Sequence, residues 1–244
     1  MKTSSMIAAG ALAAAAGIAG AQTQTITFDG LAHGEIINTQ YQLPNGVTVA
    51  AYNANKKFDL AVAFDTTRTQ TADPDLEDPW TGGNLPGTTV LGNVIIIQEN
   101  DIGIGDGIAD RPDDEGGRPA GNILFGFDAP ITEFGFDIVD LEGNLPEFSY
   151  VDFYKDGSFV GVIGFDQFVS GGAHDNGAVY GNNSINRIAP IDLVDAFGVA
   201  PDRATFFVGG SMAFDNVTFT SVPAPATAGF LGFGGLLAAR PRRA

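Results

Sequence analysis

Acidic side chains gather in three loop-like stretches that alternate with apolar, strand-like runs between Phe64 and Gly143. Calcium takes about 6–8 oxygen ligands, often from flexible loops, and loops held by rigid strands commonly carry binding residues. If these loops meet at one edge of the fold, repulsion between their carboxylates favours a bound cation. We therefore expect a Ca2+ site formed by Asp73, Asp75, Asp78, Asp113, Asp114, Asp140 and Glu142. The open alternative is a solvated acidic surface, because their spacing matches no known calcium motif.

Asp215 is a separate candidate in the strand-like run 212–219. Successive side chains of a strand point to opposite faces, so either Phe214 or Asp215 points inward. A buried carboxylate has to be paired, hydrogen-bonded or metal-bound. We expect either a hydrogen-bonded aspartate at a strand end or a second cation site, shared with Asp29 if the terminal strands pair.

Trp80 is the candidate ligand contact, because it lies in an acidic loop flanked by proline. An exposed aromatic ring at this position would offer a sugar a stacking platform. Burial in the core is the alternative and the commoner fate of aromatic side chains. We expect Trp80 to be exposed.

Residue types that indicate catalysis are scarce. The chain has two histidines, His33 and His174, and the run 209–213 lacks the final glycine of a nucleophile elbow. A glycosidase needs two carboxyl groups about 5–9 Å apart, and the 29 acidic residues allow many such pairs. No catalytic residue is therefore assigned.

The charge balance excludes several classes of partner. Residues 22–221 carry eight basic and 29 acidic side chains, a net charge of −21. Such a surface repels nucleic acid and anionic lipid headgroups, and attracts divalent cations. Cysteine is absent, which excludes a disulfide scaffold, a thiolate zinc site and a cysteine nucleophile.

The elements that must position these residues are predicted to be short strands. About eleven strand-like runs with turn signals between them fill residues 22–221. Asp156-Gly157 predicts a tight hairpin, Gly209-Gly210-Ser211 predicts another, and Leu193–Phe197 is the best helical candidate. We expect an all-β fold, an antiparallel β-sandwich of jelly-roll type, with an up-and-down barrel as the runner-up.

Residues 1–21 have the organisation of a secretory signal peptide. Lys2 supplies the positive start, Met6–Ile18 is an apolar run, and Ala19-Gly20-Ala21 is a small-residue cleavage site. We expect a signal helix that directs export, and a β-sandwich domain that spans residues 22–221.

Residues 222–244 form a three-part tail: Pro223-Ala224-Pro225, the apolar run Ala226–Ala239, and the basic residues Arg240, Arg242 and Arg243. As a helix this apolar run rises about 21 Å, which is short against a hydrocarbon core of ~30 Å. The arginines would stay cytoplasmic. We expect a short apolar sorting helix that inserts transiently into the membrane and is then processed, as the tail of a GPI signal is.

The tail resembles the PEP-CTERM sorting signal of Gram-negative bacteria, which implies an exported protein handled by an exosortase-type sorting enzyme. That family usually has glutamate between the two prolines, where this chain has Ala224. The body, from about Phe58 to Phe219, resembles a group of exported bacterial proteins with the same tail. This second resemblance implies an extracellular sandwich but no activity. The matching pieces are 64–66, 73–76, 94–99, 112–115, 136–142 and 213–217.

Together these patterns predict an exported, non-enzymatic protein of the cell surface or extracellular matrix. It would bind a cation and, as a further ligand, polysaccharide. Two alternatives stay open: a glycan-active hydrolase that uses a pair of loop carboxylates, and a purely structural or adhesive matrix protein.

Overall fold

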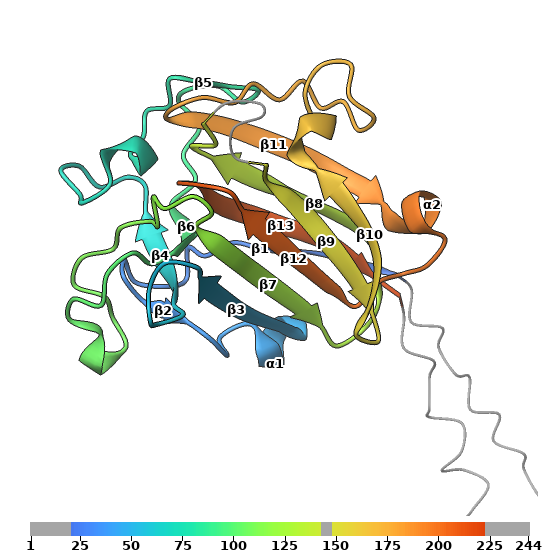
Figure 1. Cartoon of the computed structure of the whole chain (residues 1–244), viewed down its shortest axis with the longest axis horizontal. Helices are drawn as coiled ribbons and strands as arrows, with labels where there is room; N and C mark the ends of the chain where they lie inside the picture. Colours follow the sequence, from blue (N-terminus) through green and yellow to red (C-terminus); the bar gives the residue numbers. More distant parts are fainter. Residues whose placement is uncertain (1–20, 143–147, 223–244) are drawn as a thin grey trace, which may run out of the picture. The chain divides into compact units, whose positions relative to one another are not determined.

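The computed structural model describes residues 21–142 and 148–222, which build two β-sheets (Figure 1). The predicted signal helix at 1–20 and the sorting residues Pro223, Pro225, Arg240, Arg242 and Arg243 lie outside the described residues. Within the described residues, every helix is too short or too polar to cross a membrane.

The larger sheet has eight strands and is antiparallel apart from one parallel pair, β11 with β5. Along one path its strands are β2 (Ile36–Ile37), β4 (Ala61–Asp65), β6 (Asn93–Ile97), β13 (Ala213–Ser221), β8 (Ile131–Val139), β11 (Ser184–Asp192) and β5 (Gly82–Gly83). Off this path, β1 (Gln22–Ile26) pairs with β13, so the first and last strands lie side by side.

The smaller sheet has five antiparallel strands, seen side by side in Figure 1. Their order is β10 (Ser158–Gly164), β9 (Tyr150–Lys155), β12 (Arg203–Val208), β7 (Gly121–Phe127) and β3 (Val47–Asn53). Helical pieces are short: α1 (Gln42–Asn45), α2 (Leu193–Phe197), η1 (Pro74–Leu76), η2 (Ile104–Asp106) and η3 (Phe165–Gln167). An all-β sandwich, rather than an up-and-down barrel, is therefore confirmed.

The main core is rich in phenylalanine and draws on both sheets. Phe125 and Phe206 of the smaller sheet contact each other edge to face, with ring centroids 5.8 Å apart. Phe206 also packs against Phe136 and Phe214 of the larger sheet, at 4.7 and 4.3 Å. Such aromatic contacts add to the free energy gained by burying apolar area.

A second apolar cluster covers the other face of the larger sheet. Val94 and Ile96 belong to this cluster, whereas Ile95 and Ile97 belong to the main core, so β6 is apolar on both faces. The loop between β4 and β6 supplies the cover, which includes Trp80. Trp80 is only 5% exposed and donates its indole N–H to the carbonyl of Thr89 at 2.8 Å. The expectation that Trp80 is an exposed sugar platform is therefore wrong.

The connections confirm two local predictions and correct one. Asp156-Gly157 forms the tight β9–β10 turn with positive φ at both residues, and α2 spans Leu193–Phe197 as expected. Gly209-Gly210-Ser211 is not a hairpin, because β12 belongs to the smaller sheet and β13 to the larger one. This segment carries the chain from one sheet to the other and places Ser211 beside the acidic loops.

Candidate functional site

Three buried aspartates from distant parts of the chain form what we call the acid cluster: Asp73, Asp114 and Asp140. Asp73 immediately precedes η1, and Asp140 follows the last residue of β8. Asp114 forms an isolated antiparallel β-bridge with Gln98. Their side chains are between 1% and 7% exposed. The fold has therefore brought together one residue from each of the three acidic stretches.

The Ser211 hydroxyl joins two members of the acid cluster. Its Oγ lies 3.0 and 2.8 Å from the two carboxylate oxygens of Asp114, and 3.2 Å from Oδ2 of Asp140. The backbone N–H of Asp114 donates to Oδ2 of Asp73 at 3.4 Å. A serine hydroxyl has one proton to donate, so it cannot satisfy two ionised carboxylates at once.

Within residues 21–142 and 148–222, no lysine or arginine forms an ion pair with the acid cluster. Among the described residues, the ion pairs of lysine and arginine all involve other acids. Several kcal/mol is the usual penalty for burying an ion without a partner. Such a group either takes up a proton or recruits a counterion.

Burial raises the pKa of all three carboxyl groups, and the charges of neighbouring carboxylates add to the rise. The pKa of Asp140 rises to about 7, first through burial and then through the charges of Asp75 and Asp73. Burial and the charge of Asp73 raise the pKa of Asp114 well above its usual value. For Asp73 the rise also comes mainly from burial. Near neutral pH, the acid cluster therefore holds protons more strongly than ordinary carboxylates do.

Asp75 and Asp113 adjoin the acid cluster. Asp75 is exposed, and its charge raises the pKa of both Asp73 and Asp140. The pKa of Asp113 is raised to about 6 by burial and then by the charge of Asp73. These two carboxylates interact electrostatically with the acid cluster, and they could add oxygen ligands to a cation bound there.

Asn183 borders the acid cluster and was not anticipated from the sequence. Its backbone N–H donates to Oδ1 of Asp140, and its side-chain amide donates to the carbonyls of Asp75 and Glu77 at 3.0 and 2.8 Å. Its Oδ1 is buried without a hydrogen-bond partner among the described residues. The run Gly181-Asn182-Asn183 was the available signal, because it indicates a turn and asparagine tolerates a positive φ, which is 52° at Asn183.

Asp78 and Glu142 do not join the acid cluster through any contact among the described residues. The backbone N–H of Asp78 donates to the carbonyl of Thr66 at 2.9 Å. Glu142 pairs with Arg118 at 2.8 Å, so its charge is balanced by another route. Within the described residues no group of three or more His, Cys, Asp or Glu side chains is arranged to hold a metal ion. The acid cluster as it stands is therefore not a finished coordination shell.

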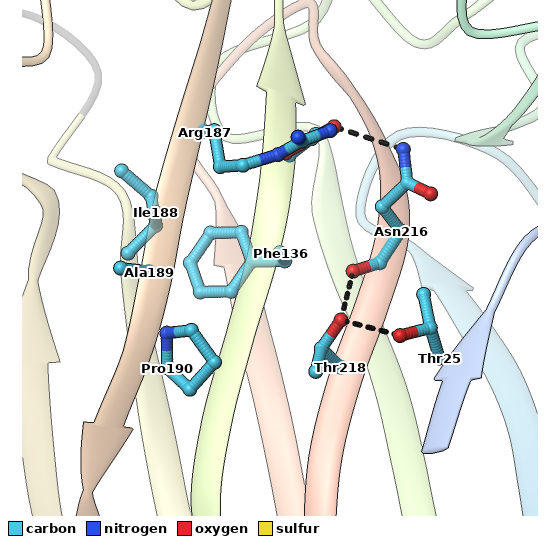
Figure 2. Close-up of a pocket in the computed structure, with 9 residues that line it drawn as sticks. Thr25, Phe136, Arg187, Ile188, Ala189, Pro190, Asn216 and Thr218 are labelled. Carbon is cyan, nitrogen blue, oxygen red and sulfur yellow. Dashed lines mark hydrogen bonds and ion pairs between the residues drawn. The ribbon is translucent and has the colours of Figure 1, made fainter. Parts of the chain in front are cut away.

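Asp137 lies on β8, three residues before Asp140, and its surroundings contrast with those of the acid cluster. Its two oxygens accept from Nε and Nη2 of Arg187 at 2.8 and 2.7 Å, and Oδ2 also accepts from Asn216 at 2.9 Å. These residues line a pocket of about 270 Å³. In Figure 2, Arg187 and Asn216 lie above Thr218 and Thr25. This buried carboxylate is thus neutralised within the chain by a bidentate arginine.

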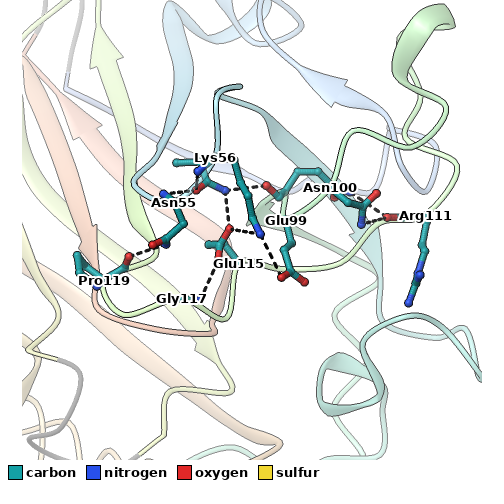
Figure 3. A network of polar contacts seen from close by, with 10 residues as sticks. Asn55, Lys56, Glu99, Asn100, Arg111, Glu115, Gly117 and Pro119 are labelled. Atoms are coloured by element: carbon teal, nitrogen blue, oxygen red, sulfur yellow. Dashed lines mark hydrogen bonds and ion pairs between the residues drawn. The ribbon is translucent and has the colours of Figure 1, made fainter.

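Glu115, the residue after Asp114, is likewise neutralised (Figure 3). Lys56 lies 3.6 Å from its carboxylate, and Asn53 and the N–H of Gly117 donate to it at 2.9 and 2.8 Å. Asp137 and Glu115, two buried acids outside the acid cluster, are therefore each paired with a cationic side chain and hydrogen-bonded to further donors.

Asp215 is buried and hydrogen-bonded, and lies on β13 opposite Asp137. Oδ2 accepts from its neighbour Asn216 at 2.9 Å, whereas Oδ1 has no partner among the described residues. Burial, followed by the charges of Asp137 and Asp29, raises its pKa to about 8. Pairing of β1 with β13 explains the proximity of Asp29. The hydrogen-bonded alternative is present, and a cation shared with Asp29 stays a prediction.

A hollow beside α2 is lined by His174 and Asp175. Asp175 accepts backbone N–H groups from Gly171 and Gly177, both at 2.8 Å, which lowers its pKa. A general acid needs a raised pKa, so Asp175 is suited to holding the loop. The hydrolase alternative also loses Trp80 as a sugar-contacting residue, because Trp80 is buried.

Comparisons with known proteins add little to this description. No family model and no curated protein matches the chain. Among solved structures, the K2 cleaved adhesin domain of Lys-gingipain (Kgp) is similar over 81% of this chain and 99% of that one. The identity is 15% and the TM-score 0.40.

Proposed function

We propose that the chain is an exported, non-enzymatic protein of the cell surface or extracellular matrix, whose jelly-roll-type sandwich binds Ca2+ at the acid cluster. One observation carries the cation assignment. The buried Asp114 and Asp140 share the hydroxyl of Ser211, Asp140 also accepts the backbone N–H of Asn183, and no lysine or arginine among the described residues pairs with either carboxylate.

Calcium suits the acid cluster better than a smaller divalent cation does. It accepts irregular sets of oxygen ligands, whereas Mg2+ demands a near-ideal octahedron. Asp73 and Asp114 lie outside the named strands, and Asp140 directly follows β8, so the three carboxylates come from an irregular set of backbone positions. Asp75, Asp113 and the unpartnered Oδ1 of Asn183 are further oxygen donors in the same neighbourhood.

The two ends of the chain have the sequence patterns of targeting signals, and these patterns support the extracellular part of the proposal. Residues 1–21 have the organisation of a signal peptide, and residues 222–244 resemble a sorting signal. An exosortase-type enzyme is the proposed partner of the tail, which inserts transiently into the membrane. Extracellular polysaccharide is the proposed ligand class, and calcium is available to such a protein outside the cell.

Calorimetric titration of the full-length chain with calcium chloride at pH 7.5 tests the cation site. We expect one saturable binding event in the wild type and an affinity about tenfold or more weaker in Asp140→Asn, which removes one of the converging charges. Asp156→Asn is the matched control. It makes the same substitution at another positive φ, but at an exposed turn away from the acid cluster. Absence of saturable binding in the wild type, or equal weakening in both variants, contradicts the proposal.

A further inference from the structure

The outer face of the five-stranded sheet carries an ordered arrangement of aromatic side chains. Side chains alternate along each strand: Phe125, Phe153 and Phe206 point into the core, and their sequence neighbours point away from it. The pairing registers of β10, β9, β12, β7 and β3 place these outward residues in rows that run across the strands.

The first row contains three aromatic residues and one amide. Tyr150 is paired with Phe207, which is paired with Asn122, which is paired with Tyr52. The rings of Tyr150 and Phe207 are stacked, with centroids 4.7 Å apart and planes within 4°. Tyr52 at the other end of the row is 54% exposed. This row therefore offers aromatic surface to solvent at two places.

Another row, four residues along the strands, contains the second aromatic group. Arg203 is paired with Tyr154, and Tyr154 with Phe159. The Arg203 guanidinium lies over the Tyr154 ring, 3.8 Å from its centroid, and Phe159 meets the same ring edge to face at 5.8 Å. Phe159 is 57% exposed. At about 3.3 Å per residue, the two aromatic rows are ~13 Å apart.

The row between them is polar at its centre. Asp152 is paired with Thr205, two residues from each aromatic row. Partial burial between the rows raises the pKa of Asp152. The face therefore has aromatic groups at both ends and hydrogen-bonding groups in the middle. We call these three rows the aromatic face.

We propose that the aromatic face binds a neutral polysaccharide chain along the strands, with sugar rings on the two aromatic rows and hydroxyl groups on Asp152 and Thr205. A sugar ring presents an apolar C–H face and a hydroxyl rim, which this alternation of surfaces matches. The net charge of −21 disfavours an acidic polysaccharide. The centre of a protein–protein interface is usually depleted of charged residues, whereas Asp152 occupies the centre here. This assignment specifies the ligand of the proposed extracellular function but uses no residue of the acid cluster.

Native affinity electrophoresis of the full-length chain tests this assignment. The gels contain hydroxyethyl cellulose, galactomannan or, as the acidic comparison, alginate, and all are run in EGTA so that failure of the calcium proposal leaves the result unaffected. We expect retardation in a neutral gel and none in alginate. Tyr52→Ala and Phe159→Ala should each weaken binding about tenfold, because each removes one stacking surface. Leu43→Ala, which removes a still more exposed apolar side chain on α1, should have no effect.

Three outcomes would overturn the assignment. One is the absence of retardation in both neutral gels. Another is retardation that Tyr52→Ala and Phe159→Ala leave unchanged. The third is a dimer in size-exclusion chromatography that the same two variants dissociate in the absence of glycan, which would assign the aromatic face to a second copy of the chain.

Discussion

Asp137 and Asp140 lie three residues apart at the end of β8, and both are at most 1% exposed. Asp137 receives two hydrogen bonds from Arg187, whereas Asp140 faces the aspartates of the acid cluster and the single hydroxyl of Ser211. The same contrast separates Glu115, beside Lys56, from Asp114. Residues 22–221 have eight basic side chains and 29 acidic ones. Some buried acids therefore have a basic partner, and others have none among the described residues.

This difference separates buried acids that the chain's own cationic side chains neutralise from buried acids that need protons or a cation from solvent. A buried acid with its own arginine contributes to a fixed structure, and removing the arginine leaves an uncompensated charge. The acid cluster pairs with no lysine or arginine among the described residues, so its charge is neutralised by protons or, as proposed, by a bound cation. Removing one charged side chain from each region should therefore change stability in opposite directions.

The largest expected effect is the loss of the arginine partner of Asp137. Arg187→Met should lower the free energy of unfolding by about 2 kcal/mol, less than the ~3–5 kcal/mol of a fully buried pair, because the guanidinium is half exposed. Urea denaturation measures it. Adding Asp137→Asn to Arg187→Met should restore most of the loss, and a double variant as unstable as the single one would show that the lost contact is not electrostatic.

Removing a charge from the acid cluster should have the opposite sign. In EGTA at pH 7.5, Asp140→Asn should raise the free energy of unfolding by about 1–2 kcal/mol, because the pKa of Asp140 is about 7 and its ionised form is unfavourable in the folded state. Asparagine retains an acceptor for the N–H of Asn183 and tolerates the positive φ of 61°. Asp156→Asn should stay within about 0.5 kcal/mol of the wild type. A loss of stability in Asp140→Asn would contradict the contrast between the two regions.

The smallest expected effect concerns the shared hydroxyl. Ser211→Ala should lower the free energy of unfolding by about 1 kcal/mol in EGTA, because a buried carboxylate loses its donor. Combined with Asp140→Asn, the two changes should be non-additive, since both alter the same contacts. Strict additivity in a double-mutant cycle would indicate that Ser211 does not connect the aspartates energetically.

Local features of the fold were predictable from the sequence. Asp156-Gly157 specifies its own turn, and α2 begins after Asp192, whose side chain caps the N–H of Asp195. These features depend on neighbouring residues only. The route of Gly209-Gly210-Ser211 was not predictable in this way, because a glycine-rich turn does not specify whether the next strand stays in the same sheet.

The position of Trp80 had a signal that local reasoning missed. Val94–Ile97 is an unbroken apolar run, which indicates a strand buried on both faces. Its second face therefore needed a cover, and the loop that carries Leu76 and Trp80 provides it. The acidic residue types were evident from the sequence. Which of them meet depends on contacts between positions 73, 114, 140 and 211, which no local pattern encodes.

The pH dependence of the melting temperature, with and without calcium, tests the lack of an internal counter-charge most directly. Asp140 faces Asp73, Asp75 and Asp114, with Ser211 and Asn183 as neutral neighbours. Its folded-state pKa lies above the unfolded value of about 4, so it stabilises the fold at low pH and loses this contribution as pH rises through about 7.

In EGTA the melting temperature of the full-length chain should fall by several degrees between pH 5 and pH 8, at ~2–4 °C per kcal/mol. Calcium should raise the melting temperature at pH 8 and flatten this fall, because a bound cation replaces the protons. Part of the fall should persist in calcium, since Asp215 titrates near 8 away from the acid cluster. Coincident curves with and without calcium across this pH range would contradict the account.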